Sequence, residues 1–166
     1  MRLILFILAI TATCVSCKKN KVAAGKDVEI YLLKTYQPVA GKCQVDAATA
    51  VLEDLPAMRN EDIFSYSKTR FQFTLSNSAI QKVNVFNGGA AFAVTVDKQV
   101  IYYGILKLNI SSSSCDHSIT MDVMLARENK IQMNLGYPGL LQGVTIDDQR
   151  NNPTLIATLN AQGKIK

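Results

Sequence analysis

The sequence predicts an α+β domain with a mainly antiparallel sheet of about six strands and two or three short helices. Two hairpins carry this prediction, because in each of them two alternating apolar segments are separated by a short polar turn. The first joins residues 92–96 to residues 100–110, and the second joins residues 119–125 to residues 131–135. No strand–helix–strand unit is apparent, so the pattern does not favour a parallel sheet.

The remaining strand signals are shorter. Alternation predicts strands at residues 28–33 and 71–75, whereas residues 61–65 favour a short turn of helix. Residues 44–55 are mixed, since alanines near the start favour helix and the later Val and Leu residues allow a strand.

Helix signals occur at two further places. Ser76 is a plausible N-cap for a short helix, and Asn152 followed by Pro153 predicts the start of a final helix. Gly163 is placed where that helix would end. No repeat or second domain is visible, and we expect residues 27–166 to form one domain.

The first residues have the features of a secretory signal. Arg2 gives a positive start, residues 3–10 are apolar, and residues 11–16 are small and mildly polar. The apolar run is too short to cross a membrane, which takes about 20 apolar residues. We therefore expect residues 1–16 to be a signal peptide that is removed.

Cys17 resembles the acceptor cysteine of a bacterial lipoprotein signal. Ser16 matches the small residue that the family pattern places before this cysteine, whereas Cys14 stands where leucine is usual and is a rival acceptor. The resemblance implies that Cys17 carries acyl chains such as palmitate, and two or more chains anchor a protein stably. Residues 17–26 would then be a lipidated cysteine and a basic tether.

The start of the tether resembles those of small lipoproteins of Bacteroidota. In that group an acidic stretch after the cysteine marks export to the surface, whereas Lys18 and Lys19 follow Cys17 here. The resemblance therefore implies a lipoprotein anchored in the outer membrane and facing the periplasm.

The positive charge of the chain lies mainly in this tether. The 166 residues carry a formal net charge of +5, and four lysines fall between residues 18 and 26. The folded part is close to neutral and has no basic and aromatic stripe, which argues against nucleic acid as a partner. A basic segment beside a lipid anchor suits anionic headgroups instead.

Two cysteines remain in the expected domain, Cys43 and Cys115. An exported compartment is oxidising, so the pair predicts a disulfide. Cys115 and His117, the one histidine, could alternatively act as a nucleophile and base. A zinc site would need further ligands at a recognisable spacing, and the sequence does not show them, so we expect neither a metal nor another cofactor.

Other polar segments also have competing interpretations. Residues 111–114 are all serine, but no G-x-S-x-G motif accompanies them, so a polar connector is the preferred interpretation. Asp147 and Asp148 could bind a cation or form an acid pair, although a solvated turn that caps the last helix is preferred.

The glycine-rich loop at residues 136–143 has no phosphate-loop lysine. Its Tyr137, Leu140 and Leu141 could form a contact surface. They could also pack beneath the final helix.

The middle of the chain resembles the periplasmic head region of the SecD family. In residues 63–105 a strand, Phe71–Leu75, is followed by a helix that starts at Ser76 and by a hairpin with an acidic turn. The resemblance implies a ferredoxin-like, noncatalytic domain that contacts polypeptide, and it transfers no catalytic residue.

These observations predict a lipid-anchored, noncatalytic protein of the cell envelope whose sheet domain binds another envelope component, most simply a protein. The alternative is an envelope hydrolase or metal-dependent enzyme that uses residues 111–117. An enzyme should bring residues 111–117 and 147–150 into one pocket, whereas a binding module should expose an apolar surface or a strand edge.

Overall fold

The computed structural model describes residues 25–86, 88–108, 110–122 and 127–166. Within these residues eight strands form one sheet in the order β2-β1-β5-β6-β7-β8-β4-β3. The strands are β1 (Val28–Thr35), β2 (Val51–Leu52), β3 (Ile63–Ser67), β4 (Gln72–Leu75), β5 (Ala91–Val96), β6 (Gln99–Lys107), β7 (Cys115–Asp122) and β8 (Lys130–Tyr137). The helices are α1 (Asn77–Val83) and α2 (Pro153–Ala161), with 3-10 turns at Asn60–Asp62 and Arg127–Asn129.

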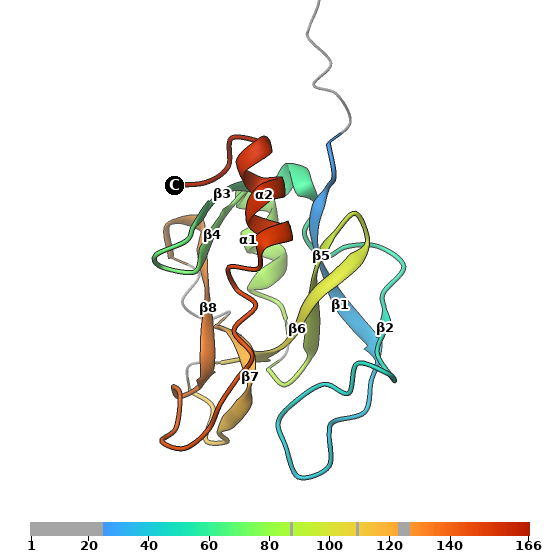
Figure 1. Cartoon of the computed structure of the whole chain (residues 1–166), viewed down its shortest axis with the longest axis vertical. Helices are drawn as coiled ribbons and strands as arrows, with labels where there is room; N and C mark the ends of the chain where they lie inside the picture. The colour runs from blue at the N-terminus through green and yellow to red at the C-terminus, as the bar shows by residue number, and fades with distance from the viewer. Residues whose placement is uncertain (1–24, 87, 109, 123–126) are drawn as a thin grey trace, which may run out of the picture.

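The prediction of an α+β fold with a mainly antiparallel sheet is confirmed (Figure 1). The sheet has eight strands and not six, because β3 was not expected and β2 lies in the segment that was left open between helix and strand. The expected signal peptide, Cys17 and most of the tether lie outside the described residues.

The prediction of helix at residues 61–65 was wrong for most of that segment. Only a 3-10 turn precedes β3, and a bulge between Ile63 and Ser65 brings Ile63, Ser65 and Tyr66 to buried positions while Phe64 stays exposed. The bulge removes the strict alternation that identifies a strand in a sequence. The mixed segment at residues 44–55 forms turns and the two-residue β2.

Both predicted hairpins are present. Asp97 and Lys98 connect β5 to β6 with positive φ at both residues, which is the turn geometry that matches the twist of paired strands. Strands β7 and β8 pair antiparallel, and the 3-10 turn at Arg127–Asn129 lies where the turn was predicted, whereas residues 123–125 of the predicted strand lie outside the described residues. Ser76 caps α1 by accepting a hydrogen bond from the Ala79 backbone, and Asn152 caps α2.

One strand pair departs from the antiparallel pattern. Strands β6 and β7 run parallel, with Gly104 beside Ile119 at the start of the pairing and Lys107 beside Asp122 at its end. A parallel pair needs a return of about a dozen residues. The pairing begins only at Gly104 and Ile119, and the site described below opens where the two strands separate before these residues.

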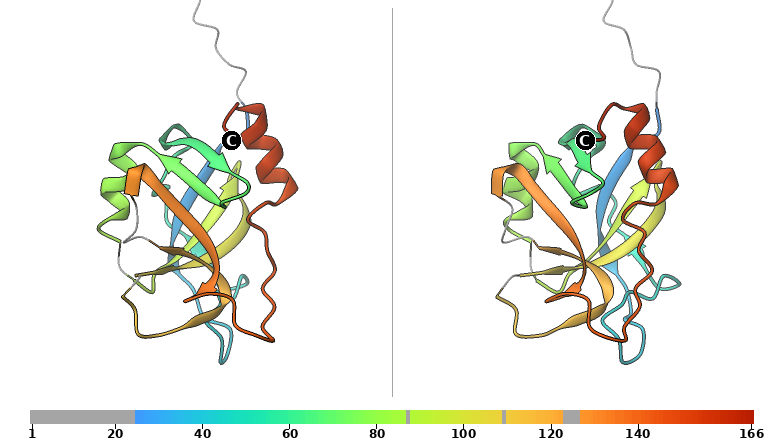
Figure 2. Two further views of the ribbon diagram at one scale, coloured as in Figure 1. Left: turned by 90° about the vertical axis from the view of Figure 1, so that its left-hand side faces the viewer. Right: turned by 60° about the vertical axis from the view of Figure 1, so that its left-hand side comes forward.

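The sheet curls around a core formed by its inner face and both helices (Figure 2). The largest fully buried side chains of this core include Tyr66, Phe73, Phe92, Leu106 and Met121. At one border of the sheet, Tyr66 exchanges backbone hydrogen bonds with Lys164 and Lys166, which follow α2. At the other border, Ile30 of β1 exchanges two with Met58. At each border, one residue of a strand, Tyr66 of β3 or Ile30 of β1, is thus paired with a segment outside the sheet.

The two ends of the molecule are formed by different segments of the chain. The chain enters beside α2, where the Gln162 amide donates to the Lys26 carbonyl at 2.7 Å, and the C-terminus lies at the same end (Figure 1). The loops at residues 36–50 and 138–147 lie at the opposite end (Figures 1 and 2). Functional features at these loops are therefore far from the point of chain entry.

The strand, helix and hairpin behind the SecD resemblance are present as β4, α1, β5 and β6. They do not form a separate unit, because β4 pairs with β3 and β8 while β5 pairs with β1 and β6. The segment therefore does not have the ferredoxin-like arrangement that the resemblance implies.

Candidate functional site

The predicted disulfide between Cys43 and Cys115 is present, with the two Cα atoms 5.0 Å apart. It fastens the loop at residues 36–50 to the start of β7. The loop covers a second, smaller apolar cluster on the outer face of the sheet, which contains Val45, Ala91 and Ile105. Both sulfur atoms belong to the disulfide that anchors the loop, so neither is the nucleophile or zinc ligand that was considered above.

A cleft of about 240 Å³ opens beside this loop, where β6 and β7 separate. The two strands pair only from Gly104 and Ile119 onward, and a register shift in β7 between Cys115 and Ile119 displaces the preceding residues. The cleft is lined by the loop, by the first parts of β6 and β7, and by the segment before α2: Gln44, Val45, Ala47, Ile101, Tyr102, Tyr103, His117, Ser118, Ile119, Ile146, Asp147 and Gln149.

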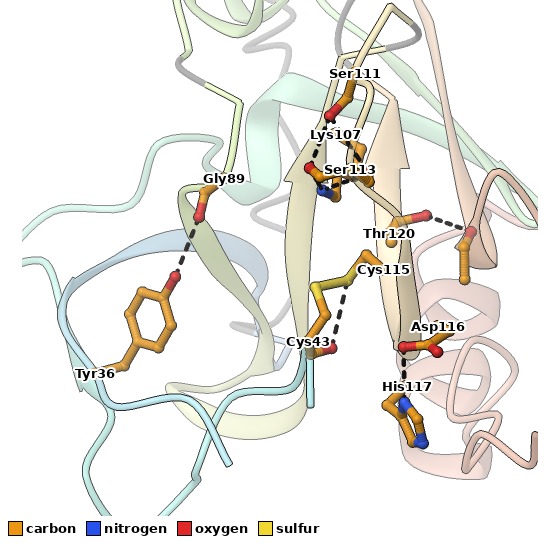
Figure 3. The surroundings of a disulfide bond; sticks show 11 residues. Tyr36, Cys43, Gly89, Lys107, Ser111, Ser113, Cys115, Asp116, His117 and Thr120 are labelled. Carbon is orange, nitrogen blue, oxygen red and sulfur yellow. Dashed lines mark hydrogen bonds and ion pairs between the residues drawn. A yellow bond between two sulfur atoms is a disulfide. The ribbon is translucent and has the colours of Figure 1, made fainter. Parts of the chain in front are cut away.

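His117 is held on the β7 side of the cleft by its neighbour. Its Nδ1 lies 2.8 Å from Oδ1 of Asp116, and this hydrogen bond is the main cause that lowers the pKa of the Asp116 carboxyl (Figure 3). Within the described part of the chain, Nε2 has no hydrogen-bond partner. A histidine oriented through Nδ1 with an available Nε2 can accept or donate a proton.

Asp147 and Gln149 form the opposite wall, and the Gln149 amide donates to the Asp147 carboxylate at 2.7 Å. Asp148 is directed differently and pairs with the buried Arg150 through two contacts of 2.7 Å. These hydrogen bonds from Arg150 lower the pKa of Asp148. The two adjacent aspartates therefore do not act as an acid pair, and Asn152 caps α2 in their place.

The contacts of Arg150 are structural. Its guanidinium lies 3.6 Å from the centre of the Phe71 ring, and its Nη1 donates to the Met133 carbonyl at 3.0 Å. The Arg150 carbonyl accepts a hydrogen bond from the Tyr66 hydroxyl at 2.8 Å. These contacts fix the segment before α2 against the sheet, and with it the wall of the cleft that carries Asp147.

The serine segment lies away from the cleft, on the other side of the disulfide from His117 (Figure 3). Ser113 accepts two hydrogen bonds from the ammonium of Lys107, at 3.0 Å to the hydroxyl and 3.1 Å to the carbonyl. Lys107 is buried, and its role could not be predicted from the sequence because it ends a long apolar strand. These contacts fold the serine connector back onto β6.

The three residues proposed as a contact surface have different environments. Leu140 and Leu141 are 52% and 43% exposed, so they do not pack beneath α2. Tyr137 is half-buried, its hydroxyl donates to the Ser111 carbonyl at 3.1 Å, and the Lys107 ammonium lies 5.8 Å from its ring centre. Of these three residues, only Leu140 and Leu141 are therefore exposed.

Tyr102 adds a feature that the sequence did not reveal. It lines the cleft from β6, it is 5% exposed, and its hydroxyl has no hydrogen-bond partner among the described residues. Burial raises the pKa of this hydroxyl well above its ordinary value, so it stays protonated and able to donate a hydrogen bond.

Among the described residues, no group of three or more His, Cys, Asp or Glu side chains could hold a metal ion. None of the described helices has the length and apolar character needed to cross a membrane. Comparison with family models, curated proteins and solved structures finds no match.

Proposed function

We propose that the protein is a lipid-anchored, noncatalytic component of the cell envelope that binds another envelope protein through the end carrying the cleft. The observation that carries this proposal is the separation of the two ends. The chain enters beside α2, whereas the loops that carry Cys43 and the exposed leucines lie at the opposite end (Figure 1). The cleft opens beside the first of these loops. A tether at one end leaves the other end free to meet a partner.

The exposed leucines favour a protein partner. Leu140 and Leu141 are adjacent apolar side chains on a loop, and exposed apolar groups of this kind are common anchors in protein interfaces. Strand addition at the borders of the sheet is less suitable, because Tyr66 of β3 and Ile30 of β1 already exchange backbone hydrogen bonds there.

Site-specific photocrosslinking in cells tests the binding surface. A photoreactive phenylalanine analogue at Leu140 is expected to give a discrete adduct with one envelope protein. The same analogue at Val85, which is 76% exposed, is the matched control and should give none. Leu141→Asp should remove the adduct at position 140, and an unchanged adduct pattern at both positions would contradict the proposal.

The anchor is tested separately through Cys17. Cys17→Ala should release the protein from outer-membrane fractions or leave an uncleaved precursor, and the wild-type N-terminus should carry acyl chains by mass spectrometry. A mature N-terminus without lipid would refute the anchor.

An enzyme using His117 is a second candidate, and one observation favours it. His117 and Asp147 line the same cleft, which is part of the convergence expected of an enzyme, although the serine segment lies elsewhere. In the cleft, Ser118 is the hydroxyl residue beside His117, but it is only 3% exposed. We expect His117→Ala to keep the fold and the crosslink at Leu140, because Leu140 is not among the residues that line the cleft. Turnover of an envelope substrate that this substitution abolishes without unfolding the protein would establish the enzyme instead.

A further inference from the structure

The charges at the cleft are of one sign. Asp147 lines it directly, and the Asp116 carboxylate stands behind the His117 ring. No lysine or arginine is among the residues that line the cleft. Arg150, which lies close in sequence to Asp147, is turned away and bound to Asp148. A positively charged group entering the cleft would therefore meet a carboxylate and no competing lysine or arginine.

The walls beside that carboxylate combine polar groups with apolar side chains. Ile101 and Ile146 face the cleft from β6 and from the segment before α2, and Val45 and Ala47 belong to the disulfide-fastened loop. Such walls suit a hydrocarbon stem, which long basic side chains bury while the charged head stays near polar groups. Tyr103 offers an aromatic surface in the same place, and cations favour aromatic faces.

The size of the cleft limits its occupant. Pockets for drug-sized ligands measure about 300 to 1,000 Å³, and this cleft measures about 240 Å³. It is therefore suited to a single side chain rather than to a large cofactor. The strands separate here, and the described part of β6 before Gly104 has no strand partner on its β7 side. An extended chain could approach that edge while its side chain enters.

We propose that the cleft is a recognition pocket for a lysine or arginine side chain on an extended segment of the partner protein. The aliphatic stem lies between Ile101 and Ile146, and the cationic head pairs with the Asp147 carboxylate. Gln149 holds that carboxylate in place through its 2.7 Å hydrogen bond. This inference rests on the proposed binding function and names the feature of the partner that is recognised.

Titration of the mature protein with capped tripeptides tests the inference. The probes are acetyl-Gly-Lys-Gly-amide, the norleucine analogue with the same stem and no charge, and the glutamate analogue. Nuclear magnetic resonance would measure affinity and identify the shifted signals. The lysine peptide should shift Ala47, Tyr103 and Gln149 and bind about fivefold more tightly than the norleucine peptide, the range of one solvent-accessible ion pair.

Two variants sharpen the result. Asp147→Asn should lower the affinity for the lysine peptide about fivefold and leave the norleucine peptide unchanged. Asp97→Asn is the matched control, because Asp97 is an exposed carboxylate in the turn between β5 and β6 and should have no effect. Raising the salt from about 50 mM to about 500 mM should weaken only the lysine peptide.

Equal binding of the lysine and norleucine peptides, tighter binding of the glutamate peptide, or no binding by any peptide would overturn the inference. The same holds if Asp147→Asn leaves lysine binding unchanged. The crosslink at Leu140 does not depend on the cleft. An adduct there without peptide binding would reject the basic side-chain pocket alone, whereas loss of the adduct would reject the binding function itself.

Discussion

Breaking the bond between Cys43 and Cys115 should cost the domain a large part of its stability. The bond spans 72 residues. In the chain-entropy model, a closed loop of this length restricts the unfolded chain by about 4 kcal/mol at 25 °C. The bond joins segments that are distant in sequence, and the loop that it fastens also packs Val45 against Ala91 and Ile105. We therefore expect most of this entropic contribution to appear in the measured free energy of unfolding.

Urea unfolding should show this loss in the reduced wild type and in the double variant Cys43→Ala/Cys115→Ala. The reduced protein isolates the cross-link, because it keeps the buried volume of Cys115, which is 0% exposed. A loss of about 4 kcal/mol corresponds to a fall in Tm of about 10 to 15 °C for a domain of this size. Reductant should not affect the double variant. A loss below about 1 kcal/mol, or full thiol labelling of native unreduced protein, would refute the reasoning.

Two further substitutions test the packing and the charge network. Gly104→Ala should destabilise the domain by about 2 to 3 kcal/mol in urea unfolding, because a Cβ there would lie only 2.6 Å from the Ile119 carbonyl oxygen. Gly139→Ala, whose Cβ would have no atom within 4 Å, is its near-neutral control, and equal effects would contradict the packing argument. Asp148→Asn should cost about 1 to 2 kcal/mol at neutral pH, after allowance for its 37% exposed side chain. Since the folded pKa of Asp148 is lowered, its contribution is present above the unfolded pKa of about 3.9 and is lost as the pH falls through the folded value. The variant should therefore lose less stability on acidification than the wild type, and parallel stability–pH curves would count against this role.

The sequence was most informative where local chemistry decides the structure. The first hairpin follows from alternation and a two-residue turn, and α1 and α2 follow from Ser76 and Asn152 as caps. The disulfide was predictable for a different reason, because only two cysteines remain once the expected signal and acceptor are set aside. In each case a few neighbouring residues, or a simple count, carry the signal.

Prediction failed where pairing over long distances decides the structure. Strand β3 exists because Ile63 pairs with Leu75 and Tyr66 pairs with residues after α2, and its bulge hides the alternation. The parallel pairing of β6 and β7 is also set by distant partners. A short polar segment between two apolar strands usually indicates a hairpin, but here the two strands run parallel, with Gly104 beside Ile119.

The same pairing explains why the cleft could not be read from the sequence. His117 and Asp147 were each noticed, but nothing local indicated that they share a cavity. Their meeting depends on the separation of β7 from β6 before Ile119, on the disulfide that fastens the adjacent loop, and on Arg150, which holds the other wall to the sheet. Each is a contact between distant segments. The cleft is therefore a product of the topology, and reduction of the disulfide should alter the resonances of Ala47 in the cleft wall even under conditions in which the sheet remains folded.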